Sequence, residues 1–180
     1  TESAASSSFS NEIYDCGYAG VSYAGAGPDP DNESNVYLYY NYIHDIKGTS
    51  AGESNAYGFA SSASTSSNGW PKNMYIRYNY VANIPTWEGL DTHGGSYQYF
   101  QYNRLYNCYS GIATQAATVS GMDKKLDHVY VDHNIIENPS TLSCYFIQMQ
   151  GSEGISDNYI GYNELFYTSR PNSAGGYGIK

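Results

Sequence analysis

The chain has 180 residues and a net charge of −9, with only eight Lys and Arg. So few cations argue against nucleic acid as a partner, because nucleic-acid binding needs a basic face. No apolar run long enough for a transmembrane helix is present, and the length suits one domain spanning residues 1–180.

One short motif returns along the chain, centred on an asparagine that an aliphatic residue follows two positions later. A degenerate copy, SFSNEIYDC (8–16), is followed by NVYLYYNYIHDI (35–46), NMYIRYNYVANI (73–84), SYQYFQYNRLYNC (96–108), HVYVDHNIIENP (128–139) and NYIGYNELFYT (158–168). The asparagines are Asn11, Asn41, Asn79, Asn103, Asn134 and Asn163, at steps of 30, 38, 24, 31 and 29 residues. This period is typical of a solenoid, in which each copy buries its apolar side against its neighbours.

Within each copy, residues alternate with a period of two, which predicts strands. A second strand is expected later in each copy, usually around a glycine: AGVSYA (19–24), YGFASS (57–62), EGLDTH (88–93), SGIATQ (110–115), YFIQMQ (145–150) and YGIK (177–180). Each copy is then one rung of parallel strands, about 4.8 Å from the next. The asparagines are expected to stack in an inward ladder that satisfies the turn backbone.

The pattern V-x-I-x-x-N-x-I, followed by glycine and an aliphatic residue, resembles the right-handed parallel β-helix of the pectate-lyase-like superfamily from about Phe9 to Ile179. The resemblance implies an all-β, right-handed, single-stranded parallel β-helix solenoid of about six rungs. The chain stops inside an expected strand and shows no capping helix, so we expect a fragment of a longer β-helix or a helix capped by a partner. Lyases, hydrolases, epimerases, tailspikes and adhesins share this fold, which alone selects no function.

The segment WEGLDTHGG (87–95) carries the candidate catalytic residues Asp91 and His93. Leu90 is expected to face the core, so that Asp91 and His93 face solvent from one strand, about 6.6 Å apart. An acid beside an imidazole suits general acid–base chemistry, and the alternative is ordinary solvated surface. The direction of Glu88 stays open, because the next glycine can hold a bulge.

The expected register also gives this pair its neighbours in the adjoining rungs. Asp91 is expected to lie between Ala60 and Ala113, with Gln148 one rung further. His93 is expected to lie between Ser62 and Gln115, with Gln150 one rung further. Gln115, Gln148 and Gln150 are therefore predicted to contact a sugar.

Two files of outward aromatic residues are expected at rung spacing. The first is Tyr37, Tyr75, Tyr99, Tyr130 and Tyr159, and the second is Tyr40, Tyr78, Tyr102, His133 and Tyr162. Such files can stabilise the sheet, form a platform for sugar rings, or form a protein interface. In the platform interpretation the predicted substrate contacts are Tyr75, Tyr99 and Tyr130, together with the nearby cations Arg77 and Arg104.

The segment VYVDHN (129–134) is similar to the V-W-I-D-H segment of pectate lyases, with Tyr130 replacing the tryptophan. The resemblance implies that Asp132 lies near a calcium site, and calcium is the one candidate cofactor. The lyase segment R-x-P-x-x-R, which supplies an arginine base, is missing, since SRPN (169–172) does not match it.

The three cysteines, Cys16, Cys108 and Cys144, are expected as small core residues. Cys16 and Cys108 share one register three rungs apart, about 14 Å, which is too far for a disulfide. No zinc-type spacing of Cys and His is present, and no residue is assigned to a metal.

The leading hypothesis is an extracellular or cell-surface protein that cleaves a polysaccharide on its lateral face, as a lyase or a glycoside hydrolase. The first alternative is a tailspike or adhesin segment that binds glycans without cutting them. The second is a structural module of a surface filament, in which tyrosine files join copies into a homo-oligomer, either a trimer or a filament.

Overall fold

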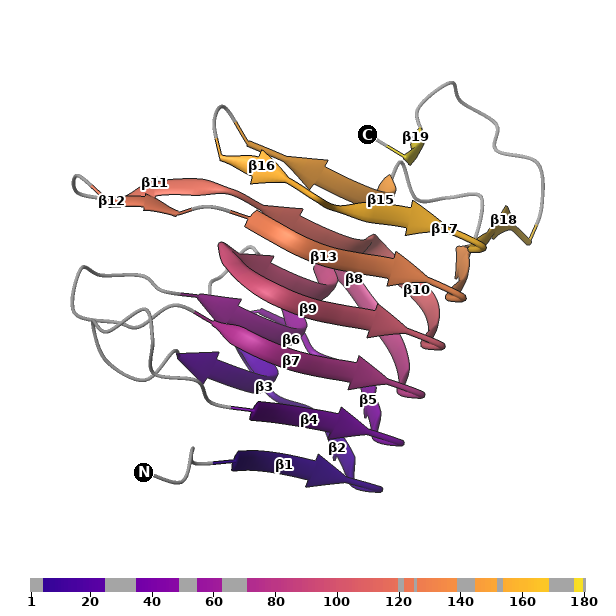
Figure 1. Ribbon diagram of the computed structural model, residues 1–180. Helices are drawn as coiled ribbons and strands as arrows, with labels where there is room; N and C mark the ends of the chain where they lie inside the picture. Colours follow the sequence, from indigo (N-terminus) through magenta and orange to yellow (C-terminus); the bar gives the residue numbers. More distant parts are fainter. Residues whose placement is uncertain are drawn as a thin grey trace.

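The computed structural model describes residues 5–24, 35–48, 55–62, 71–119, 122–124, 126–138, 145–151, 154–168 and 177–179. Their regular structure is entirely β, and these ranges contain no helix, hence none that could cross a membrane. Figure 1 shows the strands stacked one above another in sequence order, from the indigo N-terminal strands to the yellow C-terminal ones.

The strands form two sheets in which every paired strand is parallel to its neighbour. The first sheet contains β1 (Ala5–Phe9), β4 (Asn35–Tyr39), β7 (Lys72–Arg77), β9 (Gly95–Gln101), β13 (Leu126–Asp132) and β16 (Ile155–Ser156) in that order, with β17 (Tyr159–Gly161) also paired to β13. Its order follows the sequence, so each repeat adds one strand on top of the last.

The second sheet stacks in the same sequence order. Its strands are β2 (Glu12–Tyr14), β5 (Tyr42–His44), β8 (Tyr80–His93), β10 (Arg104–Gln115), β14 (Ile135–Asn138) and β18 (Glu164–Tyr167), with β3 (Ala19–Ala24), β6 (Tyr57–Ser62), β15 (Tyr145–Gln150) and β19 (Tyr177–Ile179) paired alongside. A separate antiparallel hairpin, β11 (Ala117–Val119) and β12 (Met122–Lys124), projects from the stack in Figure 1. The all-β, parallel part of the expected fold is thus confirmed.

The predicted asparagine ladder is present at the turn after each strand of the first sheet. The side-chain Nδ2 of Asn79 donates to Oδ1 of Asn103 at 3.0 Å, and the main-chain N–H of Asn79 donates to the same oxygen. The same pair of bonds links Asn11 to Asn41, Asn41 to Asn79, Asn103 to Asn134 and Asn134 to Asn163. The interior asparagines are almost fully buried, so the ladder satisfies turn groups that water cannot reach.

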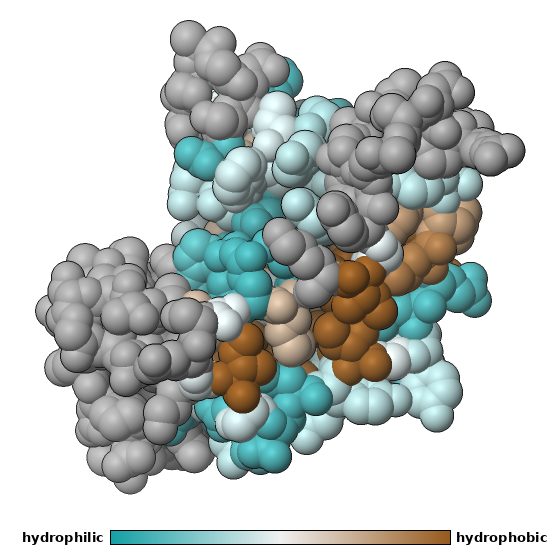
Figure 2. Space-filling view, turned by 90° about the horizontal axis from the view of Figure 1, so that it is seen from above, coloured by the Kyte–Doolittle hydropathy of each residue, from teal (hydrophilic) through white to brown (hydrophobic). Residues whose placement is uncertain are grey.

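The aliphatic residues two positions after the asparagines form the predicted core file. Ile43, Val81, Leu105 and Ile136 are paired rung to rung and are fully buried. Leu165, the last of the file, packs against the core but is only partly buried. Figure 2, which looks along the stack from above, shows apolar surface toward this end of the molecule.

Both predicted aromatic files are present, although the first is half-buried from Tyr37 to Tyr130 and is not stacked at its last member. Tyr37, Tyr75, Tyr99 and Tyr130 follow one another with ring centroids 5.0–5.3 Å apart, whereas Tyr159 is tilted against Tyr130 at 6.5 Å. In the second file, Tyr40, Tyr78, Tyr102, His133 and Tyr162 stack at 4.8–5.1 Å and are exposed.

Of the cysteines, Cys108 is fully buried as predicted, while Cys16 is only partly buried at the edge of the core. Cys144 lies outside the described residues.

We expect Leu105→Ala to lower the free energy of unfolding by about 2–5 kcal/mol, because the change leaves a cavity in a fully buried file. Leu165→Ala is the matched control from the same file. Its cost should be smaller, since Leu165 is already partly exposed. Equal losses for the two variants in urea unfolding would contradict the burial gradient along the file.

Candidate functional site

The candidate site begins at a local break in the alternation of strand β8. A Cβ built on Gly89 would lie 2.7 Å from Cδ2 of Leu105 and 3.1 Å from Sγ of Cys108, so this position faces the core. The next residue, Leu90, is also fully buried in the core. Two consecutive inward positions break the period of two, and Glu88 therefore reaches the same side as Asp91.

Glu88, Asp91 and His93 meet as a compact group, which we call the acid–imidazole trio. One ligand atom from each side chain lies within 4.8 Å of the others. Oδ2 of Asp91 is 3.4 Å from Nε2 of His93. The two carboxyl groups are buried, with 4% of Glu88 and 2% of Asp91 exposed, whereas His93 is partly open to solvent.

The burial of Asp91 corrects the prediction that it faces solvent. Its neighbours are the expected ones, because Ala60 and Ala113 pair with Asp91 from the adjacent rungs. However, both alanines are themselves buried, so this outer face of the sheet is covered. Tyr57, also buried, lies close enough to Asp91 and Glu88 that their charges add to burial in raising its pKa.

Burial and mutual repulsion change the ionisation of both acids. The pKa of Glu88 rises from an ordinary 4.5 to about 9, first through burial and then through the charge of Asp91. Burial also raises the pKa of Asp91, and the contact with His93 opposes that shift. Two buried carboxylates this close cannot both be ionised cheaply, so Glu88 holds a proton at neutral pH.

A surface hollow of about 290 Å³ opens beside Glu88, and we call it the glutamine hollow. It is lined by Trp87, Glu88, Tyr109, Ser110, Gln115, Tyr145, Gln148 and Gln150. Its volume lies just below the usual range for small-molecule sites, about 300–1,000 Å³. The rings of Trp87 and Tyr109 are nearly parallel, with centroids 6.3 Å apart, and both belong to the wall.

A chain of amide hydrogen bonds crosses the hollow and ends on Glu88. Nε2 of Gln148 donates to Oε1 of Gln150 at 2.6 Å, and Nε2 of Gln150 donates to Oε1 of Gln115 at 3.0 Å. Nε2 of Gln115 then donates to Oε1 of Glu88 at 3.3 Å. The three predicted glutamines are therefore brought together, and they orient the Glu88 carboxyl group.

The other predicted contacts are distributed differently. Asp91 and His93 do not line the hollow, and Glu88 is the member of the trio that does. The predicted contacts Tyr75, Tyr99 and Tyr130 are stacked on the first sheet. The guanidinium of Arg77 lies 5.1 Å from the ring centroid of Tyr75 and 5.4 Å from that of Tyr99. Arg104 pairs with Glu137 and lies near the ring of Tyr80, and it too does not line the hollow.

Asp132, which the resemblance places near calcium, is engaged in protein contacts. Its Oδ1 is 2.6 Å from Nδ1 of His133, and its Oδ2 accepts a hydrogen bond from Gln101 at 2.8 Å. Within the described ranges, no group of three metal-ligating side chains includes Asp132. The cluster of potential ligands lies instead at the trio.

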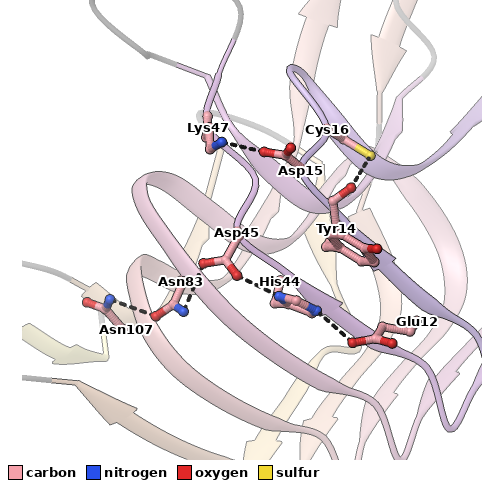
Figure 3. A network of polar contacts seen from close by, with 9 residues as sticks. All are labelled: Glu12, Tyr14, Asp15, Cys16, His44, Asp45, Lys47, Asn83 and Asn107. Atoms are coloured by element: carbon pink, nitrogen blue, oxygen red, sulfur yellow. Dashed lines mark hydrogen bonds and ion pairs between the residues drawn. The ribbon is translucent and has the colours of Figure 1, made fainter.

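A second acid–imidazole group, shown in Figure 3, differs from the trio by being saturated with partners. Nδ1 and Nε2 of His44 lie 2.6 Å and 3.3 Å from Asp45 and Glu12, and Asn83 donates to Asp45. The hydrogen bond to Asp45 is the main cause of a raised pKa at His44. Lys47 also pairs with Asp15 nearby. Because each acid here has a cation or donor beside it, the group needs no further ligand.

Sequence reasoning missed Glu88 and the aromatic wall of Trp87, Tyr109 and Tyr145. The signal available for Glu88 was the glycine after it, which allows a bulge but does not fix the direction of the Glu88 side chain.

Comparisons of the chain with protein-family models, with curated proteins and with solved structures find no match. The geometry of the trio and the hollow is therefore the basis for a functional conclusion.

We expect the free energy of unfolding to fall as pH rises from about 4.5 to about 9, because the folded protein holds a proton on Glu88 that the unfolded chain releases. The slope contributed by one such group is at most about 1.4 kcal/mol per pH unit. Glu88→Gln cannot ionise and should flatten this part of the curve. Exposed Glu164→Gln is the control, and a Glu88→Gln curve that keeps the wild-type slope would show that Glu88 is not the group responsible.

Proposed function

We propose that the chain is a right-handed parallel β-helix of the pectate-lyase-like kind, extracellular or on a cell surface, that binds a neutral polysaccharide and hydrolyses it on its lateral face. Two observations support the fold. Each sheet adds strands in sequence order with parallel pairing, and connections between parallel strands are almost always right-handed. The asparagine ladder also keeps the repeats in one register.

The observation that carries the proposed chemistry is a protonated, buried carboxyl group at the edge of a hollow. Glu88 holds its proton at neutral pH and can donate it to the oxygen of a glycosidic bond. His93 is the member of the trio most open to solvent, and Asp91 beside it can orient the ring and stabilise its charged form. His93 can then take a proton from the attacking water.

The lining of the hollow favours a neutral sugar over an acidic one. Aromatic rings and side-chain amides match the apolar faces and hydroxyl groups of a sugar. Among the described residues, no Lys or Arg lines the hollow, and Glu88 adds acid character to it. β-Elimination on a uronic acid needs a positive group to stabilise the developing charge, so hydrolysis is favoured over a lyase reaction.

The test is a reducing-sugar assay on a panel of neutral and acidic polysaccharides. We expect Glu88→Gln and Asp91→Asn to lower turnover of the cleaved substrate by about 10²–10⁴-fold, the usual contribution of a positioned acid or base. Asp132→Asn is the matched control, because Asp132 is also a buried carboxylate beside a histidine but belongs neither to the trio nor to the lining of the hollow.

Cleavage that survives Glu88→Gln would contradict the proposed acid. Absorbance from unsaturated products would instead identify a lyase. Binding of a glycan without cleavage would leave the tailspike or adhesin alternative.

The filament alternative is favoured by a different observation, the two stacked aromatic files. Several of their rings are well exposed, with 59% of Tyr40 and 77% of Tyr162 accessible, and exposed aromatic surface is typical of interfaces. If these files join copies of the chain, the double variant Tyr99→Ser and Tyr130→Ser should turn an oligomer into folded monomer in analytical ultracentrifugation. Tyr18→Ser, an exposed tyrosine outside both files, is the control. A wild-type protein that is monomeric at high concentration would exclude this function.

A further inference from the structure

The two buried acids of the trio leave oxygen atoms without a donor. Oδ1 of Asp91 and Oε2 of Glu88 are inaccessible to solvent and have no hydrogen-bond partner unless one of the two acids is protonated and donates to the other. The other Glu88 oxygen, Oε1, accepts the hydrogen bond from Gln115. A buried carboxylate oxygen without a donor is costly, so either one proton shared by the two acids or one cation has to lie between them.

We propose that the acid–imidazole trio is a binding site for a divalent transition-metal ion of the zinc class, with Glu88, Asp91 and His93 as its protein ligands. The ion would take the place of the proton between the two carboxyl groups. The inference uses the same residues as the proposed hydrolase, but it does not depend on the cleavage of a glycan.

The donor set selects the class of metal. Two carboxylates neutralise a divalent ion, and an imidazole is a preferred ligand of zinc and its neighbours in the periodic table. Calcium instead takes six to eight oxygen ligands, and the trio offers only two carboxylates and one nitrogen. Three protein ligands with a fourth position left for water is the arrangement of reactive zinc sites.

The geometry is close to that of a bound ion and needs a small contraction. Ligands about 2.0–2.2 Å from a tetrahedral ion are roughly 3.4 Å from one another. The ligand atoms of the trio lie within 4.8 Å of one another. Side-chain rotations that move these atoms by about 1 Å bring them to the separation that one ion requires. Gln115 supports this arrangement from outside, since its bond to Oε1 of Glu88 leaves Oε2 for the metal.

Occupancy by a metal would also control the proposed hydrolase. A Glu88 carboxylate bound to zinc has lost the proton that the reaction needs, so zinc should inhibit cleavage and a chelator should restore it. The trio would then hold either a proton, in the active form, or an ion, in the inhibited form.

The experiment is a calorimetric titration of metal-free protein with Zn²⁺, repeated with Ca²⁺, and with Co²⁺ followed by its visible absorption. We expect one Zn²⁺ per chain and at least ten-fold weaker binding in Glu88→Gln, Asp91→Asn and His93→Gln. The control is His44→Gln, from the group in Figure 3 whose imidazole already contacts two carboxylates, and it should bind Zn²⁺ as the wild type does.

Wild-type protein that binds no Zn²⁺ at 100 µM, or that binds Ca²⁺ equally well, would overturn the inference. Binding unchanged in Glu88→Gln would overturn it too, since any site made by the cysteines is intact in that variant. If a buried variant fails to fold, partly exposed His93→Gln decides the result alone. Zinc bound by the trio in a protein that cleaves no glycan would support this inference while contradicting the hydrolase, so the two can fail separately.

Discussion

The hydrogen bonds of the asparagine ladder are the interaction on which the rest of the structure depends. The side-chain Nδ2 of each interior asparagine donates to Oδ1 of the asparagine in the next rung and to a main-chain carbonyl of the previous rung, as Asn79 does with Asn103 and Leu38. The residue before each asparagine has a left-handed backbone, with φ of 58° at Tyr40 and Tyr78 and 57° at Tyr102. This conformation is costly for a tyrosine, and the buried amide bonds hold it in place. The core file and the aromatic files follow from this fixed turn.

Much of the fold and of the register could be predicted from sequence, because both follow from a repeated motif. The asparagine spacing sets the pairing only as far as Cys108, after which the register shifts, and the alignment of Gly89 with Gly111 is what pairs Asp91 with Ala113 and His93 with Gln115. These neighbours were predicted correctly. The burial of Asp91 was not, because burial depends on what covers the outer face of the sheet, and the repeat carries no information about that cover.

Glu88 shows the limit of periodicity most clearly. Strict alternation from Leu90 would have turned Glu88 toward the core, and only the two inward positions at Gly89 and Leu90 bring it out to Asp91. The corner needs a glycine, because a Cβ at this position would collide with Leu105 and Cys108. The alternation along the strand is broken at this corner, and the same inward glycine recurs at Gly58 and Gly111 in the adjoining rungs.

The direction of the asparagine ladder has a consequence for symmetry. Main-chain N–H groups can only donate, and each donates to the Oδ1 of the following asparagine, so every amide along the file points the same way. Any length of such a file has one end that presents a side-chain oxygen and another that presents an N–H. Two unlike ends are complementary, whereas two like ends would oppose oxygen to oxygen or N–H to N–H. A stack with this polarity is suited to head-to-tail contacts, which build chains or closed rings, and unsuited to an end-to-end dimer about a two-fold axis.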